Sequence, residues 1–410
     1  MKRRSLLFTV SILTAFIACS QNMKSPVFIP APIDAKLVKE NEIKLLKGPS
    51  VLIDDNKLVW GASVVEGDDG MYHMFFSTWD SGPNKLKFGD SWVLNSMIGY
   101  AVSKYPDRDF KFKKNILKGR RFDGITDAWD SQMVHNPHVK KFNNNYYLYY
   151  IGSYDPGHQL KGSPGENLNK RNRVQQSQTI GAIEFETFDD LLKGNFIRPD
   201  KPLLTPRTRV KNDNILDPSP AGTIALPDNI IVVNPSVVYH AADKKYFLYF
   251  KGNFYDPNWR GVHGVAISDS PIGPFKAKDN IIFDIRLPDG KIASAEDPYV
   301  WFDERNQLFY ALVKDFSGAI TGDEPGLAML QSKDGLEWET TKNPFFMKKQ
   351  VLLKGGTKIK VTHLERPQLL INEEGEPSVF YGACSIESLS KLYDTGTFNV
   401  HIPLIKKEEK

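Results

Sequence analysis

The sequence predicts an all-β protein, a five-bladed β-propeller in which four-stranded antiparallel blades surround a central funnel. Five segments repeat one plan: a short strand, a polar turn and then a strand rich in Tyr and Phe. Consecutive segments begin 63 to 98 residues apart, at Gly61, Asn136, Asn234, Asp297 and Arg366. Repeats of this length indicate a radial array in which each repeat forms one sheet. An irregular β-sandwich with chance Tyr-rich strands is the alternative fold.

The strands follow in order along each repeat. The aromatic second strands are expected at 71–76, 146–150, 246–250, 308–312 and 377–381. Polar turns that suit hairpins precede three of them, at 67–70, 143–145 and 373–375. Four repeats continue into a third strand, at 98–103, 180–183, 263–268 and 326–330. The segments 270–275 and 333–338 resemble turns into an outer fourth strand.

The N-terminus has the pattern of an export signal. Residues 1–4 are MKRR, residues 5–17 are mainly apolar, and Cys19 ends the segment FIAC, which resembles a lipobox. We therefore expect a signal peptide at 1–19, a linker at 20–45, and one propeller domain at 46–405 with a basic insertion at about 154–230. The predicted location is the periplasm or the outer membrane, with a lipid anchor at Cys19. A plain secretory signal is the alternative.

Composition and charge narrow the function classes. The 53 basic and 49 acidic residues give a net charge of +4, which does not favour nucleic-acid binding and is compatible with an anionic small substrate. Cys384 is the one other cysteine, so no disulfide within the mature chain is expected. The histidine spacing matches no metal motif, and no cofactor is predicted. A structural or bridging divalent metal is still compatible with the sequence.

The repeats resemble those of the five-bladed propeller glycoside hydrolases, the group that contains families 32, 43, 62, 68 and 117. The openings of the form Asp-Pro-x-Val and the Tyr-rich strands carry the resemblance over about residues 60–384. The stretch 234–275 is most similar to family 117, the anhydrogalactosidases that act on algal oligosaccharides. The resemblance implies that the first residues of the innermost strands face one pocket, where three blades supply a base, a modulator and a proton donor.

The acids that this resemblance implies are partly replaced. Gly61 stands at the position of the first-blade acid and Asn234 at that of the third, whereas Glu296 and Asp297 remain in the fourth. We predict as catalytic residues His135, His263, His363, Glu296 and Asp297. We predict as substrate-binding residues Asn136, Asn234, Lys251, Arg366 and Trp60. A structural role is the alternative for each histidine, because a lone histidine at a strand end is commonly a hydrogen-bonded structural residue.

These replacements favour elimination over hydrolysis. Arg, Lys and Asn side chains can neutralise a uronate carboxylate, and histidine titrates near neutral pH, as a base for the α-proton requires. The favoured hypothesis is an exported enzyme that forms an unsaturated uronate at the non-reducing end of an acidic, sulfated algal oligosaccharide. The first alternative is an inverting exo-glycoside hydrolase that uses Glu296 or Asp297 as donor and Asp127 or Asp130 as base. The second is a propeller that binds carbohydrate without catalysis.

Overall fold

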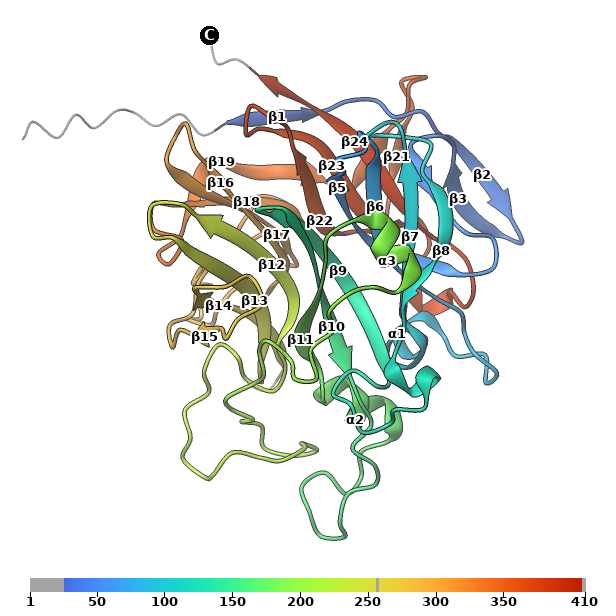
Figure 1. Cartoon of the computed structure of the whole chain (residues 1–410). Coiled ribbons are helices and arrows are strands. Elements are labelled where there is room, and N and C mark those ends of the chain that lie inside the picture. The colour runs from blue at the N-terminus through green and yellow to red at the C-terminus, as the bar shows by residue number, and fades with distance from the viewer. Residues whose placement is uncertain (1–25, 256–257, 408–410) are drawn as a thin grey trace, which may run out of the picture.

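The computed structural model describes residues 26–255 and 258–407, in which antiparallel sheets are arranged around one axis (Figure 1). Five sheets form the blades, one for each sequence repeat, which confirms the predicted five-bladed β-propeller. The signal segment 1–19, with Cys19, lies outside the described residues.

Each blade begins with its innermost strand and proceeds outward along the chain. Blade 1 contains β5 (Leu58–Glu66), β6 (Tyr72–Trp79), β7 (Met97–Ser103) and β8 (Lys111–Leu117). Blade 2 contains β9 (Met133–Phe142), β10 (Asn145–Ser153) and β11 (Thr179–Phe185). Blade 3 contains β12 (Val233–His240), β13 (Lys245–Tyr255), β14 (Trp259–Ser268) and β15 (Lys276–Ala277). Blade 4 contains β16 (Ala295–Asp303), β17 (Leu308–Asp315), β18 (Gly326–Ser332) and β19 (Glu339–Lys348).

Blade 5 combines the two ends of the chain. It contains β22 (His363–Ile371), β23 (Pro377–Ser385) and β24 (Thr397–Lys407), and β24 also pairs with β1 (Val27–Pro30) and β4 (Val51–Leu52). Much of the segment 20–45, expected to be a linker, is therefore structured: β1 completes blade 5, and β2 (Lys36–Glu40) pairs with β3 (Ile43–Lys47). The physical reason is that the backbone groups of an outer strand need partners, and β1 supplies them for β24.

Blade 2 departs from the four-stranded plan. Within the described residues it has three paired strands, and two isolated bridges, Glu184 with Ile197 and Ile180 with Leu204, lie beside β11. Pro199 and Pro202 lie between these bridges. Because proline has no backbone N–H to donate to a ladder, the segment follows the edge of the blade without forming a continuous strand.

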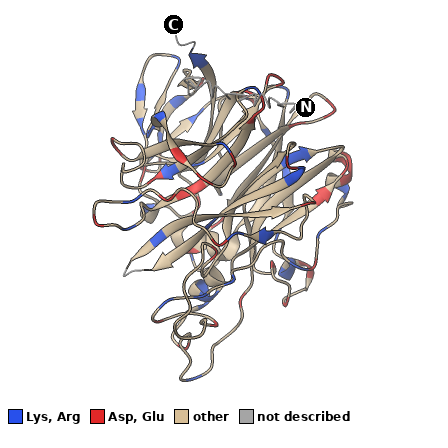
Figure 2. Ribbon diagram, turned by 90° about the vertical axis from the view of Figure 1, so that its left-hand side faces the viewer, with Lys and Arg blue, Asp and Glu red and all other residues tan. Residues whose placement is uncertain are grey.

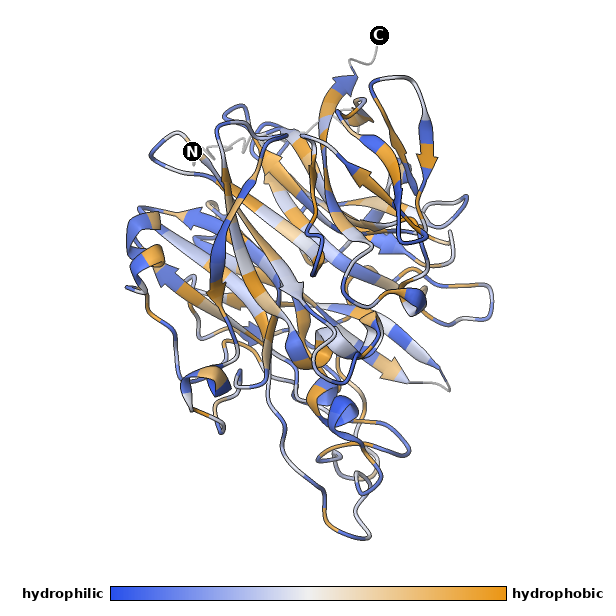
Figure 3. Cartoon of the chain, turned by 90° about the vertical axis from the view of Figure 1, so that its right-hand side faces the viewer, coloured by the Kyte–Doolittle hydropathy of each residue, from blue (hydrophilic) through white to orange (hydrophobic). Residues whose placement is uncertain are grey.

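The blades pack face to face, which explains the aromatic runs. Tyr146, Leu148 and Tyr150 of β10 belong to a buried cluster shared with blade 1, whereas Tyr147 and Tyr149 belong to a cluster shared with blade 3. Side chains alternate between the two faces of a strand, so a strand buried on both faces is apolar at every position. Figure 3 shows the apolar residues, in orange, mainly on the strands.

The remaining elements lie in the connections between the strands, within or between blades. They are the helices α1 (Phe88–Asn95), α2 (Lys170–Gln176) and α3 (Phe188–Lys193), the 3-10 turns η1 (Arg120–Asp123) and η2 (Leu389–Lys391), and the hairpin of β20 (Gln350–Leu352) with β21 (Lys358–Lys360). The basic insertion at 154–230 carries α2, β11 and α3, and its long loops extend from one end of the propeller (Figure 1). No helix in the described ranges has the length and apolar character needed to cross a membrane.

Candidate functional site at the centre of the propeller

All five innermost strands share one backbone irregularity at the blade opening. In each, the pairing with the second strand shifts register, and the residue at the shift has a positive φ between 50° and 58°. These five residues are Gly61, Asn136, Asn234, Asp297 and Arg366. A left-handed backbone is strained for most side chains and is readily adopted by Gly, Asn and Asp. The repeated bulge therefore places the five residues at equivalent positions around the axis.

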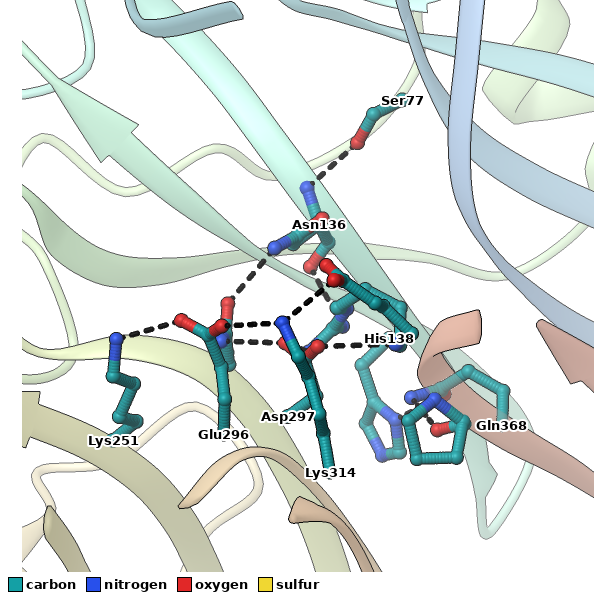
Figure 4. A network of polar contacts seen from close by, with 12 residues as sticks. Ser77, Asn136, His138, Lys251, Glu296, Asp297, Lys314 and Gln368 are labelled. Carbon is teal, nitrogen blue, oxygen red and sulfur yellow. Dashed lines mark hydrogen bonds and ion pairs between the residues drawn. The ribbon is translucent and has the colours of Figure 1, made fainter. Parts of the chain in front are cut away.

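Four of these residues form a hydrogen-bonded ring, which we call the floor of the site (Figure 4). Asn136 Nδ2 donates to Asn234 Oδ1 at 2.8 Å, and Asn234 Nδ2 donates to Asp297 Oδ1 at 2.7 Å. The backbone N–H of Arg366 donates to Asp297 Oδ2 at 3.0 Å, and its Nη2 reaches the carbonyl oxygen of Asn136 at 3.5 Å. All four side chains are buried, so the floor is a buried polar network.

Gly61, the fifth blade-opening residue, lies beside this ring between Asn136 and Arg366 and has no side chain. A Cβ atom at this position would lie 3.0 Å from Asn136 Oδ1 and 3.3 Å from Arg366 Cγ, and the φ of Gly61 is +52°. The floor therefore has no space for the carboxylate that the family resemblance implies at this position.

We expect Gly61→Ala to destabilise the fold by about 1–2 kcal/mol from the left-handed backbone alone, and the close contacts add to this loss. Thermal unfolding would measure the change. Gly70→Ala is the matched control, because Gly70 also has a positive φ, of 71°, but has open space around its Cβ direction. Equal losses in the two variants would contradict the packing argument.

Five residues, each one position before a blade-opening residue, form the wall of a cavity of about 190 Å³. They are Trp60, His135, Val233, Glu296 and Glu365, one from each blade, and all five line the cavity. Asn136, Asn234 and Asp297 of the floor line it as well, together with Lys251. We call this space the inner cavity.

Two lysines connect the carboxyl groups of the inner cavity. Lys251 Nζ lies 2.6 Å from Glu296 Oε1, and Lys314 Nζ lies 2.6 Å from Glu365 Oε1 and 3.4 Å from Glu296 Oε2. Each lysine comes from the second strand of its blade, β13 or β17, and Lys314 pairs in register with Glu296. Both glutamates are thus held by charge-assisted contacts from blades 3 and 4.

The three carboxyl groups differ in pKa. Desolvation opposes the ionisation of Glu296, but Lys251 and Lys314 outweigh it and lower the pKa of this group. Burial raises the pKa of Glu365, and Lys314 offsets only part of the rise. Burial also raises the pKa of Asp297 to about 7, and the negative charge of Glu296 adds to the effect. The site therefore combines a carboxyl group that loses its proton more readily than usual with two that lose it less readily.

The same three groups are close enough to hold a cation. Oxygen atoms of Glu296, Asp297 and Glu365 lie within 4.8 Å of one another. The ammonium group of Lys314, however, already contacts both glutamates. Lysine thus supplies positive charge where a divalent ion would otherwise be needed.

The predicted histidines do not meet in one place. His135 lines the inner cavity, where its ring stacks on Trp92 at 4.7 Å and its Nδ1 lies 2.8 Å from Ser96 Oγ. His263 is 1% exposed and packs against Phe283, outside the cavity lining. His363 lines a separate cavity of about 170 Å³. His263 lies on the third strand of blade 3, where it pairs with Lys251, and His363 lies two residues before Glu365 on β22. Each ring is therefore farther from the inner cavity, across or along its sheet.

The pKa values of the three histidines are lowered. Burial and the charge of Arg366 hold the pKa of His135 well below its ordinary value. Burial, reinforced by neighbouring lysines, lowers the pKa of His263 to about 3 and that of His363 to about 4. All three rings are therefore neutral at pH 7, and none can act as a protonated acid in that state.

The predicted substrate-binding residues divide into two groups. Trp60, Asn136, Asn234 and Lys251 line the inner cavity. Arg366 does not line it: this residue of the floor is 1% exposed, and its Nη1 lies 3.7 Å from Asp297 Oδ1. Its charge is thus directed to a carboxylate of this chain.

The alternative bases from the sequence analysis lie elsewhere. Asp130 is buried and pairs with Arg120 at 3.0 Å and Arg198 at 2.7 Å, and Asp127 is exposed. Neither is among the described residues that line the inner cavity. Two arginines satisfy the carboxylate of Asp130, which gives it a structural role between the insertion and blade 2.

Sequence reasoning missed the roles of Glu365 and Lys314. Glu365 precedes the blade-opening pair Arg366-Pro367 as Glu296 precedes Asp297-Pro298, so an alignment of the repeats would have found it. Lys314 likewise lies near the end of the second strand of blade 4, at a place similar to that of Lys251, which follows the aromatic run of blade 3.

Comparisons with known proteins support the fold. No protein-family model matches the sequence, and no curated protein matches it either. Among solved structures, Zg3597, a family 117 glycoside hydrolase from Zobellia galactanivorans, matches with a TM-score of 0.53 and 14% identity over 92% of this chain and 90% of that one. An α-L-arabinofuranosidase from Lactobacillus brevis matches with a TM-score of 0.52 and 13% identity, covering 86% and 92% of the two chains. A thermostable family-43 glycoside hydrolase matches with a TM-score of 0.52 and 11% identity, covering 87% and 92%.

The similarity extends over most of each chain, whereas the sequence identity is low. It therefore concerns the arrangement of the blades rather than individual site residues. The resemblance to families 43 and 117 expected from the sequence is confirmed at this level: the chain has the five-bladed propeller fold that these glycoside hydrolases have.

Proposed function

We propose that this protein is a carbohydrate-active enzyme that cleaves a glycosidic bond in the inner cavity by carboxyl acid–base catalysis. One observation carries the proposal: Glu296 and Glu365 stand at equivalent positions of blades 4 and 5, and their pKa values are shifted in opposite directions. Two carboxyl groups with opposite shifts are what glycoside hydrolysis requires, because one must be ionised while the other carries a proton. The shared fold with glycoside hydrolases supports the same function class.

In the proposed reaction, Glu365 is the general acid. Its proton passes to the glycosidic oxygen as the bond between that oxygen and the anomeric carbon breaks. The ionised Glu296 adds to the anomeric carbon, and a water molecule then replaces it while returning a proton to Glu365. The oxygen atoms of the two groups lie within 4.8 Å, whereas inverting enzymes separate their carboxyl groups by about 6.5–9.5 Å to admit a water. The spacing therefore supports retention. The sequence analysis favoured elimination, and its hydrolase alternative was an inverting enzyme.

The size of the inner cavity supports action at a chain end. Its volume of about 190 Å³ lies below the range of about 300–1,000 Å³ that holds a drug-sized ligand. A single sugar ring suits such a space better than a length of polysaccharide. Trp60 supplies an aromatic wall, and the amides of Asn136 and Asn234 supply hydrogen-bonding groups.

β-Elimination is the second candidate, and His135 is the observation that favours it. The ring is neutral, lines the inner cavity and is oriented by Ser96, as a base for an α-proton would be. The cations predicted to neutralise a uronate carboxylate are, however, already paired: Lys251 with Glu296 and Arg366 with Asp297. Export and lipid anchoring at Cys19, and a sulfated algal substrate, are proposals that rest on the sequence alone.

The reaction products distinguish the two candidates. We expect incubation with glycan oligosaccharides to release a new reducing end without any gain in near-ultraviolet absorbance, because hydrolysis forms no double bond. Elimination to an unsaturated uronate would give that absorbance. The chromophore in the absence of hydrolysis would overturn the hydrolytic proposal, and a boiled enzyme sample is the control.

The pH dependence follows from the carboxyl cluster. Burial raises the pKa of Glu365, the proposed general acid, so this group keeps its proton at higher pH than an ordinary glutamate does. We therefore expect kcat/KM to fall as the pH rises through the pKa of Glu365, about tenfold per pH unit beyond it. Initial rates from about pH 4 to about pH 9 would test this. A rate that does not fall at the alkaline end of this range would contradict a carboxyl acid.

A further inference from the structure

A second, larger cavity opens directly onto the inner one. It has a volume of about 760 Å³ and shares four lining residues with the inner cavity: Gln175, Ile231, Lys251 and Asn253. Its other walls come from α2, from the loops of the insertion around 211–231, and from the start of β14. We call it the outer cavity. A glycan whose terminal ring occupies the inner cavity would extend through it.

The charges that line the outer cavity are all positive. Arg171, Lys211 and Lys251 line it, and no Asp or Glu of the described residues does. Figure 2 shows Lys and Arg segments, in blue, in the lower loops that carry the insertion. Low-dielectric walls concentrate the field of such cations and attract anions.

The acidic partners of two of these cations lie outside the cavity lining. Lys211 Nζ lies 3.0 Å from Asp213 Oδ1, and its side chain is 8% exposed whereas that of Asp213 is 63% exposed. Arg171 Nε lies 3.3 Å from Asp90 Oδ1, whose side chain is 57% exposed. Water screens these exposed carboxylates more than it screens the less exposed cations that they contact. The cavity wall therefore retains positive character.

Three other arginines of the insertion have structural partners. Arg173 pairs with Asp155 at 2.9 Å, and Arg207 pairs with Asp228 at 2.8 Å. Arg209 donates to the backbone carbonyl of Gln176. The insertion thus directs Arg171 and Lys211, rather than its whole positive charge, at the outer cavity.

An aromatic surface accompanies the cations. Trp259 lines the outer cavity, is 49% exposed and packs edge-on against Tyr255, with Lys211 Nζ 5.7 Å from the centre of its ring. Phe316 also lines the outer cavity and is exposed. A half-exposed Trp in a cavity with several amide side chains suits the flat face of a sugar ring.

We propose that the outer cavity binds an anionic substituent, a carboxylate or a sulfate ester, on the glycan unit next to the ring in the inner cavity. Lys211 and Arg171 neutralise the anion, and Trp259 supports the ring that carries it. This inference rests on the proposed function, because it requires a glycan to occupy the inner cavity. It moves anion recognition from Lys251 and Arg366, which contact the less exposed carboxylates of the site, to the insertion, whose cations contact exposed ones.

Binding of three oligosaccharide probes to the Glu365→Gln protein tests the proposal without turnover. The probes are an oligogalacturonate, its fully methyl-esterified form, and a sulfated galacto-oligosaccharide of similar length, with Kd measured by calorimetry at two salt concentrations. We expect at least one charged probe to bind about 10-fold or more tightly than the ester, which corresponds to one charge-assisted contact. The stronger of the two charged probes identifies the carboxylate or the sulfate as the preferred anion.

Two substitutions locate the binding. Lys211→Met should raise the Kd of the charged probe by about 10-fold and reduce its salt dependence, and Trp259→Ala should weaken all probes that bind. Lys406→Met is the control, because Lys406 pairs with Glu376 away from both cavities.

The outcomes separate this inference from the proposed function. Equal Kd values for both charged probes and the ester, or a tightly bound charged probe unaffected by Lys211→Met, would overturn the inference even if the wild-type enzyme hydrolyses a neutral glycan. Charge-dependent binding that Lys211→Met weakens would support the outer site. If the wild-type enzyme then releases no reducing end from any probe, the hydrolytic function fails and the anion site stands.

Discussion

Replacing Glu365 with Gln is expected to lower kcat by about 10²–10⁴-fold, because the variant keeps the shape of the side chain but has no proton to donate to the leaving oxygen. Glu296→Gln should cause a loss of similar size, since the amide can neither add to the anomeric carbon nor balance the charges of Lys251 and Lys314. Initial rates on a cleavable glycan, with circular dichroism to verify folding, would measure both effects.

Glu376→Gln is the matched control for these two variants. Its carboxylate pairs with Lys406 at 2.5 Å, distant from the inner cavity, and its removal should leave kcat unchanged. His135→Gln decides between the two candidate functions. If this variant is inactive while both glutamate variants retain wild-type rates, the chemistry is elimination by a histidine base and the carboxyl mechanism is wrong.

Arg366→Ala is expected to reduce the free energy of unfolding by about 3–5 kcal/mol, a large fraction of the stability of a domain. The Arg366 side chain is almost completely buried, and it offsets the charge of Asp297 and reaches the backbone of Asn136. Removing it leaves an uncompensated carboxyl group and a cavity in the floor. The sequence analysis expected a role in substrate binding for Arg366, whereas its position predicts a structural one. Denaturant unfolding would measure the loss.

Arg305→Ala is the control, because Arg305 forms an exposed pair with Glu376 and such pairs contribute about 0–1 kcal/mol. Adding Asp297→Asn to Arg366→Ala should recover part of the stability, since the double variant has no unpaired charge. Wild-type stability in the single variant, combined with loss of substrate affinity, would contradict the structural role and restore the original expectation.

The repeats alone were sufficient for the architecture and for part of the site. Each blade opening lies at the residue where the repeat was recognised, from Gly61 to Arg366. Four of the five openings precede a proline, and four of the five residues are Gly, Asn or Asp, which tolerate the left-handed backbone of the bulge. The sequence likewise identified Glu296, Asp297, Asn136 and Asn234, which do meet at the axis. Repetition places equivalent residues in equivalent positions, so one short motif defines five positions at once.

The tertiary structure decided which of the polar residues near the openings share a cavity. His263 and His363 lie within the same stretches of sequence as the site residues, yet neither lines the inner cavity. His263 is on the third strand of its blade and His363 is two residues before Glu365, so both lie farther from the axis although they share a face with cavity residues. The pKa values were equally inaccessible, since those of Glu296 and Glu365 depend on Lys251 and Lys314, and three blades contribute these four groups. The sequence by itself determined the five-bladed fold and the ring of blade openings, which are local and repeated. The pairing of charges across blades was decided by packing, because electrostatic interaction depends on distance in space and not on separation along the chain.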